Sequence, residues 1–376
     1  MSVQSPALGR VHREGAERLA VIDTDVHPRM TPTDPRFNPL LPQRWRDYLD
    51  LIGLRSGELE AQVPRQRPFA SRTDAMPPGG GIPGGDPAFA AVQLLDAYDM
   101  TAAMLNNITA VSWARGTGNH PVEFQFALAR AINDWHHAYW LEADPRWRAS
   151  INVPWEQPAE AVRELERCRG LSDRFVQVLL ESRADEPIGN PRYWPLFEAA
   201  EALGIPIAFH VGGNRRMTAS GTPSFYFEDH CDFPLRNFNI VASLIFEGVF
   251  DRFPGLRIAF LEQGWSWVVP YAWRLDASWR ALRAEVAHLQ RPPSEYIREH
   301  FWFSSQPMEE PEHLEWFVEV LAMFEDFGLA DRLMYSSDYP HWDFDAPDEA
   351  VPLTLPLESR RRILAGNASA LYGIPV

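Results

Sequence analysis

Acidic and histidine residues stand together where an apolar run near the N-terminus ends, in the segment IDTDVH at residues 22–27. Side chains alternate along a strand, so Asp23, Asp25 and His27 are expected on one face. In a closed barrel that face points inward, where charged groups lose several kcal/mol through desolvation unless a cation balances them. The pattern therefore indicates a divalent metal site, although simple capping of a loop by strand-end residues would also explain it.

Two further apolar runs end in residues that bind metals. His210 closes one of them, and Asp338 stands just past another. Taken alone, the histidine could be structural and the aspartate could cap a helix. Together with Asp25 and His27 they form an oxygen and nitrogen ligand set suited to Zn²⁺, Mn²⁺ or Fe²⁺. We expect one or two such ions per chain.

Other polar residues stand near these positions. Glu262 ends another apolar run, and we interpret it as a general base, a second-metal ligand or a substrate contact. His230, His341 and Asp23 are candidates for a second ion or for hydrogen bonds to the ligands, although either histidine could also lie on a surface loop. The candidates for catalysis are Asp338, Glu262 and His230. Six aromatic residues could line an apolar pocket or belong to the core: Phe225, Tyr226, Phe227, Trp265, Trp267 and Trp302.

The elements that would position these residues alternate between short strand-like and longer helix-like runs, as in a parallel sheet with crossover helices. Helix-like segments include residues 122–141, 159–167, 194–203 and 235–250. Eight such pairs favour a single (β/α)₈ TIM barrel over a doubly wound sheet. The eight predicted strands are Leu19–Asp25, Ala103–Asn107, Ala149–Val153, Phe175–Leu180, Pro206–His210, Arg257–Glu262, Phe301–Phe303 and Leu333–Ser337.

Two long irregular segments follow predicted strands 1 and 5. The first runs from Pro28 to Gly85, and the second from Val211 to Pro234. The carboxyl ends of barrel strands are where active sites and their covering loops are built, so we expect a lid-like insertion at about residues 28–90. A surface loop without that role is the alternative. The whole chain, residues 1–376, is expected to form one domain.

Composition narrows the possible partners. The 51 acidic and 35 basic residues give a net charge of -16, which disfavours nucleic acid and anionic lipid surfaces. The sequence contains no lysine, so a carboxylated lysine cannot bridge two metals. Two cysteines exclude a disulfide framework, and neither a signal peptide nor an apolar run of about 18 residues is visible. We expect a soluble, cytoplasmic protein with a small-molecule substrate and no membrane partner.

The sequence resembles the amidohydrolase-related family, often called the amidohydrolase 2 branch of the amidohydrolase superfamily. The motifs that carry the resemblance span nearly the whole chain: IDTDVHP, RAINDW, IGNPRYWPLFEAAEALGIPIAFHVGG, FPGLRIAFLEQGWSW, SSDYPHWD and ILAGNASALYGI. The resemblance implies a (β/α)₈ barrel that is often dimeric or larger, as a homo- or hetero-oligomer. It also implies metal ligands at Asp25, His27, His210 and Asp338.

The family includes hydrolases and decarboxylases of aromatic or unsaturated acids, and one position separates this chain from the decarboxylases. They carry a histidine at the end of strand six, whereas this chain has Glu262. The first hypothesis is therefore a metal-dependent hydrolase acting on a small organic substrate, with Asp338 or Glu262 moving the proton. The alternatives, in order, are a non-oxidative decarboxylase, a dinuclear iron-containing oxygenase or hydroxylase, and a catalytically silent partner subunit.

Overall fold

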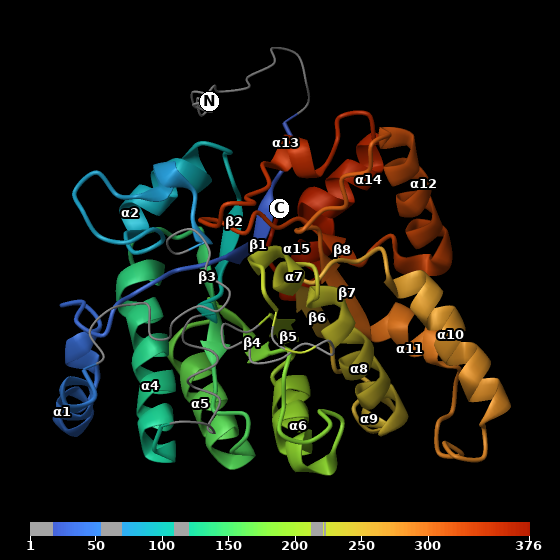
Figure 1. The fold of residues 1–376 in the computed structure, drawn as a ribbon, viewed down its shortest axis with the longest axis horizontal. Helices are drawn as coiled ribbons and strands as arrows, with labels where there is room; N and C mark the ends of the chain where they lie inside the picture. The colour runs from blue at the N-terminus through green and yellow to red at the C-terminus, as the bar shows by residue number, and fades with distance from the viewer. Residues whose placement is uncertain (1–17, 54–69, 109–119, 212–220, 222) are drawn as a thin grey trace.

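Eight parallel strands form one sheet in which each strand pairs with its neighbours in chain order, from β1 to β8. The computed structural model describes residues 18–53, 70–108, 120–211, 221 and 223–376. The strands run through the middle of the molecule and the helices lie around them (Figure 1). Their bounds are β1 Ile22–Val26, β2 Ala102–Leu105, β3 Trp147–Asn152, β4 Phe175–Glu181, β5 Ile207–His210, β6 Ile258–Leu261, β7 Phe301–Ser304 and β8 Leu333–Met334.

The sheet closes where the end of the chain meets its beginning. Thr24 donates its backbone N–H to Tyr335, and Asp338 donates to Asp25, over 3.1 Å in both cases. An isolated parallel bridge joins Val26 to Tyr339. The expected (β/α)₈ barrel is confirmed, and its closure brings the β1 and β8 ends together.

The eighth strand is shorter than expected. The sequence predicts Leu333–Ser337, but pairing with β7 stops at Met334. The backbone N–H of Tyr335 turns instead to the carbonyl of Ile363, at 2.8 Å. Asp338 consequently lies in the loop beyond the strand. The first strand is likewise displaced, to Ile22–Val26 in place of Leu19–Asp25.

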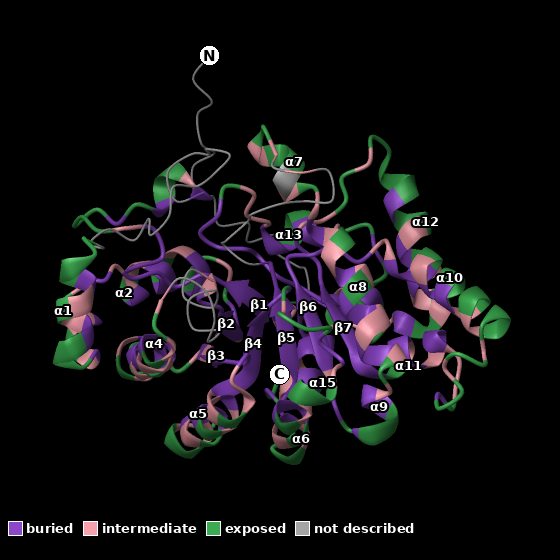
Figure 2. Ribbon diagram, turned by 60° about the horizontal axis from the view of Figure 1, so that its bottom comes forward, coloured by how far each residue is buried: buried purple, intermediate pink, exposed green. Residues whose placement is uncertain are grey.

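The helices cover the barrel with apolar faces inward. Figure 2 shows the strands buried and the outer helix surfaces exposed. In α4, Phe124, Leu128, Ile132 and Trp135 repeat at helical spacing and are buried. The α-helices are α1 Gln43–Leu51, α2 Pro87–Ala90, α4 Val122–Trp135, α5 Pro158–Leu171, α6 Trp194–Ala202, α7 Tyr226–His230, α8 Phe233–Phe246, α9 Val249–Arg252, α10 Val268–Ala281, α11 Pro293–His300, α12 Leu314–Phe324, α13 Pro347–Ala350, α14 Leu357–Arg361 and α15 Asn367–Tyr372.

Short 3₁₀ and π turns complete the architecture. The π turn η5 extends α4 to residue 141, as the sequence predicts for this helix. The helix predicted at 235–250 is divided in two, because Gly248 has a φ of 75° and separates α8 from α9. The turns are η1 Asn38–Leu40, η3 Thr73–Ala75, η4 Ala91–Asp96, η5 His136–Leu141, η6 Pro191–Tyr193, η7 Glu325–Leu329 and η8 Arg362–Gly366.

The described part of the first insertion lies against the loop that follows β8. Arg72 donates its backbone N–H to the carbonyl of Pro340 over 2.9 Å, and Trp342 donates to Ala70 over 2.8 Å. Residues 54–69 of this insertion fall outside the described residues, as do residues 212–220 and 222 of the second one. A lid role for residues 28–90 stays a prediction.

Candidate metal centre

The end of β1 places two side chains at the barrel mouth. His27 is buried, and its Nδ1 lies 2.9 Å from the carbonyl oxygen of Asn106, so the ring directs Nε2 inward. Asp25 is also fully buried, and its Oδ1 accepts a hydrogen bond from the Asn106 amide at 2.7 Å. Asn106 follows β2 and fixes both groups. The sequence did not indicate this role of Asn106, which appears there only as a polar residue after an apolar run.

His210 and Glu262 meet these residues from β5 and from the end of β6. His210 Nδ1 lies 2.8 Å from the carbonyl oxygen of Val211, which turns Nε2 toward the interior. That Nε2 is 3.1 Å from Asp25 Oδ2 and 3.2 Å from Glu262 Oε2. Glu262 Oε2 also lies 3.9 Å from His27 Nε2. Three strand ends thus converge on one point.

Asp338 reaches the same place from the loop after β8. Its Oδ1 is 2.6 Å from His27 Nε2 and 2.5 Å from His341 Nδ1. Arg29 lies 2.7 Å from His341 Nε2 and can only donate there, so His341 is a neutral ring whose Nδ1–H donates to Asp338. Burial, followed by the charges of His27 and Arg29, holds the pKa of His341 well below its usual value. Arg29 was not among the residues singled out from the sequence.

Asp23 has a different position from Asp25 and His27. Its carboxylate accepts hydrogen bonds from the backbone N–H of Asp25 at 3.0 Å and from the hydroxyl of Ser337 at 2.5 Å. The backbone N–H of Ser337 also donates to it, at 3.0 Å. Asp23 therefore ties β1 to the β8 loop and does not belong to either group of potential ligands that the structure brings together. Burial raises its pKa to about 7.

The donor atoms form two overlapping groups, each with all its atoms within 4.8 Å of one another. One contains Asp25, His27, His210 and Glu262, and the other contains His27, Glu262, Asp338 and His341. Within the described part of the chain, His27 Nε2 and Glu262 Oε2 are buried and complete no hydrogen bond, although Asp338 Oδ1 lies 2.6 Å from the first atom and His210 Nε2 3.2 Å from the second. Buried polar atoms of native proteins normally have hydrogen-bond partners. These two unsatisfied atoms are therefore suited to binding a cation as ligands.

The electrostatics of the cluster also favour a cation. Burial would lower the pKa of His210, but Asp25 and Glu262 outweigh burial and raise it to about 10. Burial would raise the pKa of Asp25, and the charges of His210 and His27 lower it instead. The pKa of Asp338 rises far above its usual value through burial and the nearby carboxylates, Glu262 first. The shifts of His210 and Asp338 reflect carboxylates crowded together in a buried site, and a divalent ion would offset their repulsion.

Two of these residues have a strained backbone. Glu262 has a φ of 54° and Asp338 a φ of 60°, in the left-handed region that residues with a Cβ rarely adopt. Such a conformation costs about 1–3 kcal/mol and persists where the surroundings enforce it, most often at functional sites. Both carboxylates are directed into the cluster, Glu262 directly after β6 and Asp338 from the loop after β8.

His230 lies beside the cluster. Its Nε2 is 3.0 Å from Asp343 Oδ2, and the same oxygen accepts a hydrogen bond from the Gln306 amide at 3.0 Å. Gln306 Nε2 lies 3.4 Å from Asp338 Oδ2 as well. His230 is thus connected to Asp338 through two intervening side chains. Gln306, which follows β7, is a further residue that sequence reasoning missed.

The six aromatic residues that could line an apolar pocket do not lie together. None of the six residues is among the described residues that line the cavity of about 720 Å³ next to the cluster. Tyr226 adjoins that cavity, because its hydroxyl accepts a hydrogen bond from Trp342 at 3.3 Å. The others lie elsewhere: Phe225 and Phe227 are exposed and stack on each other, Trp265 packs against Phe317 and Phe324 in the core, Trp267 packs against Phe238 and Phe303, and Trp302 lies under Arg332. Contact of any of them with a substrate stays a prediction.

A closed eight-stranded barrel with buried histidine and carboxylate donors at the carboxyl ends of its strands is the framework of a metal-binding (β/α)₈ protein. The chain belongs to the family described as Amidohydrolase, whose model, of the amidohydrolase 2 branch, matches residues 22–374. The family expected from the motifs is therefore confirmed. Across the described residues, no helix combines the length and apolar character needed to cross a membrane.

Two curated relatives and one solved structure are similar to this chain. The chain is 26% identical over 265 residues to a γ-resorcylate decarboxylase of Polaromonas sp. (strain JS666), covering 65% of this chain and 76% of the relative. It is 26% identical over 262 residues to a 2-amino-3-carboxymuconate-6-semialdehyde decarboxylase of Dictyostelium discoideum, covering 66% and 67%. A dihydroxybenzoic acid decarboxylase from Polaromonas sp. JS666, solved with manganese and 2-nitroresorcinol, superimposes with a TM-score of 0.62 at 20% identity, over 95% of this chain and 97% of the other.

Proposed function

We propose that this protein is a metal-dependent decarboxylase that releases CO₂, without oxidation, from a small aromatic or unsaturated carboxylic acid. The observation that carries the proposal is the convergence of His27 and His210, each fixed through Nδ1, with the carboxylates of Asp25, Glu262 and Asp338. The decarboxylase activities named for the relatives support this reaction over the hydrolysis that the sequence favoured first.

The residues that would hold the ion are Asp25, His27, His210 and Asp338. Glu262 belongs to both groups of donor atoms, and Asp338 is grouped with His27 but not with Asp25 and His210. Imidazole and carboxylate donors suit Mn²⁺, Zn²⁺ and Fe²⁺. When bound, such an ion supplies a positive charge that holds the carboxylate of the acid and an adjacent oxygen. The hydrogen bonds from Asn106 and to Val211 keep the donors oriented in advance.

The reaction requires one proton and no oxidant. The bond between the substrate carbon and its carboxylate breaks, CO₂ leaves, and the electron pair that remains on carbon takes up a proton. Glu262 is placed to deliver that proton, because its side chain is buried and its Oε2 faces the cluster, 3.2 Å from His210 Nε2. It stands where the decarboxylases resembled by the sequence carry a histidine, and a carboxylic acid can fill the same role.

Two other hypotheses each have one observation in their favour. A carboxylate at residue 262 also suits a general base that activates water, as the hydrolase hypothesis requires. The two overlapping groups of donors, which share His27 and Glu262, keep the hypothesis of a two-ion oxygenase open. A catalytically silent subunit is disfavoured, because a buried set of unpaired donors is costly to retain without a ligand.

The test is an assay of CO₂ release by the Mn²⁺-loaded protein, with 2,6-dihydroxybenzoate and 5-carboxyvanillate as first substrates, since relatives act on these acids. In D₂O, the product should carry one deuterium on the carbon that lost the carboxylate, with no oxygen consumed. Hydrolysis products without CO₂, or uptake of oxygen, would overturn the proposal. Metal analysis of protein purified without added metal separates one ion from two.

A further inference from the structure

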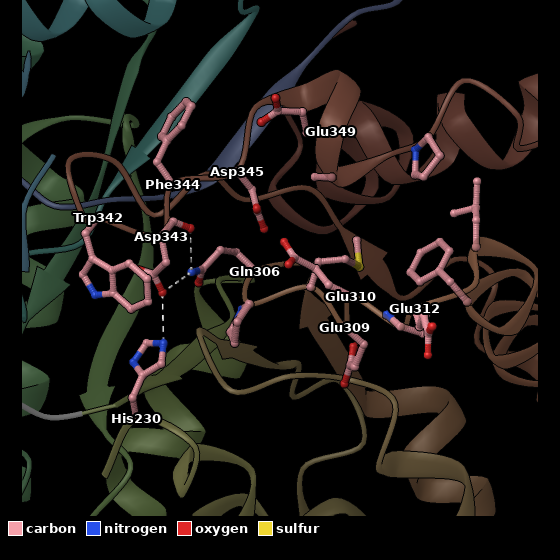
Figure 3. A pocket seen from close by; sticks show the side chains of 17 residues that line it. His230, Gln306, Glu309, Glu310, Glu312, Trp342, Asp343, Phe344, Asp345 and Glu349 are labelled. Carbon is pink, nitrogen blue, oxygen red and sulfur yellow. Dashed lines mark hydrogen bonds and ion pairs between the residues drawn. The ribbon is translucent and has the colours of Figure 1, made fainter. Parts of the chain in front are cut away.

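A cavity of about 720 Å³ lies beside the metal centre, between the segment that follows β7 and the loop after β8. It is bounded by residues 306–312 on one side and 342–349 on the other, and Figure 3 shows their side chains around it. Among the described residues, its lining contains six carboxylates, no arginine and a single basic side chain, that of His230. The six are Glu309, Glu310, Glu312, Asp343, Asp345 and Glu349.

An independent observation at Gln306 shows what kind of ligand this cavity fits. Gln306 is fully buried and lines the cavity, with its amide end directed toward Asp343 (Figure 3). Its amide nitrogen donates to the carboxylates of Asp343 and Asp338, at 3.0 and 3.4 Å. Its amide oxygen has no hydrogen-bond partner among the described residues. The unsatisfied atom is thus a hydrogen-bond acceptor surrounded by other acceptors, and a ligand that donates hydrogen bonds would satisfy it.

The carboxylates also repel one another. Glu310 and Asp345 point toward each other across the cavity (Figure 3). Burial, followed by the charges of Glu310 and Asp343, raises the pKa of Asp345 to about 7. A positively charged group between them would offset this repulsion, while an anionic group would increase it.

We propose that this cavity binds the ammonium group of the substrate, so that the acid decarboxylated at the metal centre carries a protonated amine at its other end. The claim that the ammonium group belongs to the decarboxylated substrate rests on the proposed function. The claim that the cavity binds an ammonium ion does not. The two sites lie one side chain apart, because the single Gln306 amide bridges Asp338 of the cluster and Asp343 of the cavity. The aromatic rings of Trp342 and Phe317 line the cavity and suit an arylalkyl amine.

Binding is tested by isothermal titration calorimetry of the full chain with 2-phenylethylammonium, 2-phenylethanol and 3-phenylpropionate. These probes share nearly the same size and differ in charge. We expect the ammonium ion to bind at least about tenfold more tightly than the alcohol, and the carboxylate to bind more weakly than either at this cavity. Equal affinity for the ammonium ion and the alcohol would overturn the inference. Binding of Ca²⁺ in place of the ammonium ion would also overturn it.

Two variants locate the binding. Glu310→Gln removes one exposed charge and should weaken the binding of 2-phenylethylammonium by about two- to fivefold. The double variant that also carries Asp345→Asn should weaken this binding by about tenfold or more. Glu315→Gln is the matched control, because Glu315 is exposed nearby but does not line the cavity. An unchanged affinity in the double variant, or an equal loss in the control, would contradict the inference.

The outcomes separate this inference from the proposed function. The protein could bind the ammonium ion through Glu310 and Asp345 and yet release no CO₂ from any acid tested. That result would contradict the proposed decarboxylase function alone. CO₂ release in a protein that shows no preference for the ammonium ion would count against the cavity alone. If both hold, 4-(aminomethyl)benzoate should inhibit CO₂ release more strongly than benzoate, and the double variant should remove that difference.

Discussion

Replacement of Glu262 by glutamine tests the centre most directly, because this residue belongs to both groups of donors. The substitution removes a charge and a proton donor but keeps the size of the side chain. Its backbone N–H donates to the hydroxyl of Ser304 at 3.0 Å, and this contact does not involve the side chain. The variant is therefore expected to fold and to keep the strained conformation at residue 262.

The expected magnitude follows from what Glu262 contacts. Its Oε2 is buried and lies 3.2 Å from His210 Nε2, so the side chain reaches the point where a substrate at the metal centre would lie. Loss of a general acid typically lowers turnover by about 10²- to 10⁴-fold, or about 3 to 5 kcal/mol of activation free energy. The four proposed ligands, Asp25, His27, His210 and Asp338, are unchanged in this variant, so the content of a single ion should be unchanged.

The assay combines turnover, measured as CO₂ release, with elemental analysis of the same preparation. Glu315→Gln, an exposed change of the same kind, serves as the control. Full metal content with turnover reduced by at least about 10²-fold is the expected result. A loss of about one metal equivalent per chain would show instead that Glu262 binds a second ion. Full metal content with full turnover would refute the role assigned to Glu262.

Three further results are expected. His210→Ala should abolish metal retention while circular dichroism shows a folded barrel, since the core lies below the rim. Chelator-treated protein should not bind 2,6-dihydroxybenzoate in calorimetry until Mn²⁺ is restored, because the acid would meet buried carboxylates. Burial lowers the pKa of His136 to about 3 from 6.5, so stability should be highest above pH 6.5 and fall by about 3 kcal/mol on acidification to pH 4. His136→Phe should remove most of that loss in denaturant unfolding, and an unchanged slope would contradict the burial argument.

The sequence was sufficient for the barrel and for the positions of the candidate ligands, because both depend on local pattern. Apolar runs of strand length mark the barrel strands, and alternation along β1 places Asp25 and the residues beside it. His210 and Glu262 could be identified because each follows such a run directly. Asp338 could be identified even though its strand ends four residues earlier, since the loop backbone remains bonded to β1.

The remaining features depend on contacts between residues far apart in the chain. Arg29 and His341 are 312 positions apart, and no local pattern indicates that the guanidinium fixes the ring. Gln306 is an ordinary polar residue until folding places it between two carboxylates. The aromatic residues were named from the sequence, but their location could not be predicted, because such side chains suit a core as well as a pocket. Trp265 is buried in the core, and only the folded structure distinguishes the two.

The signs of the charges at the barrel mouth limit how a substrate can lie. A carboxylate would be repelled by Asp25, Glu262 and Asp338 unless a cation stood among them, and it would be repelled again by the carboxylates around Glu310. These charges favour a binding mode in which the metal centre holds the acid end and the cavity holds a cationic end. This arrangement would place the carboxylate beside Glu262, so electrostatics alone would select the bond that breaks.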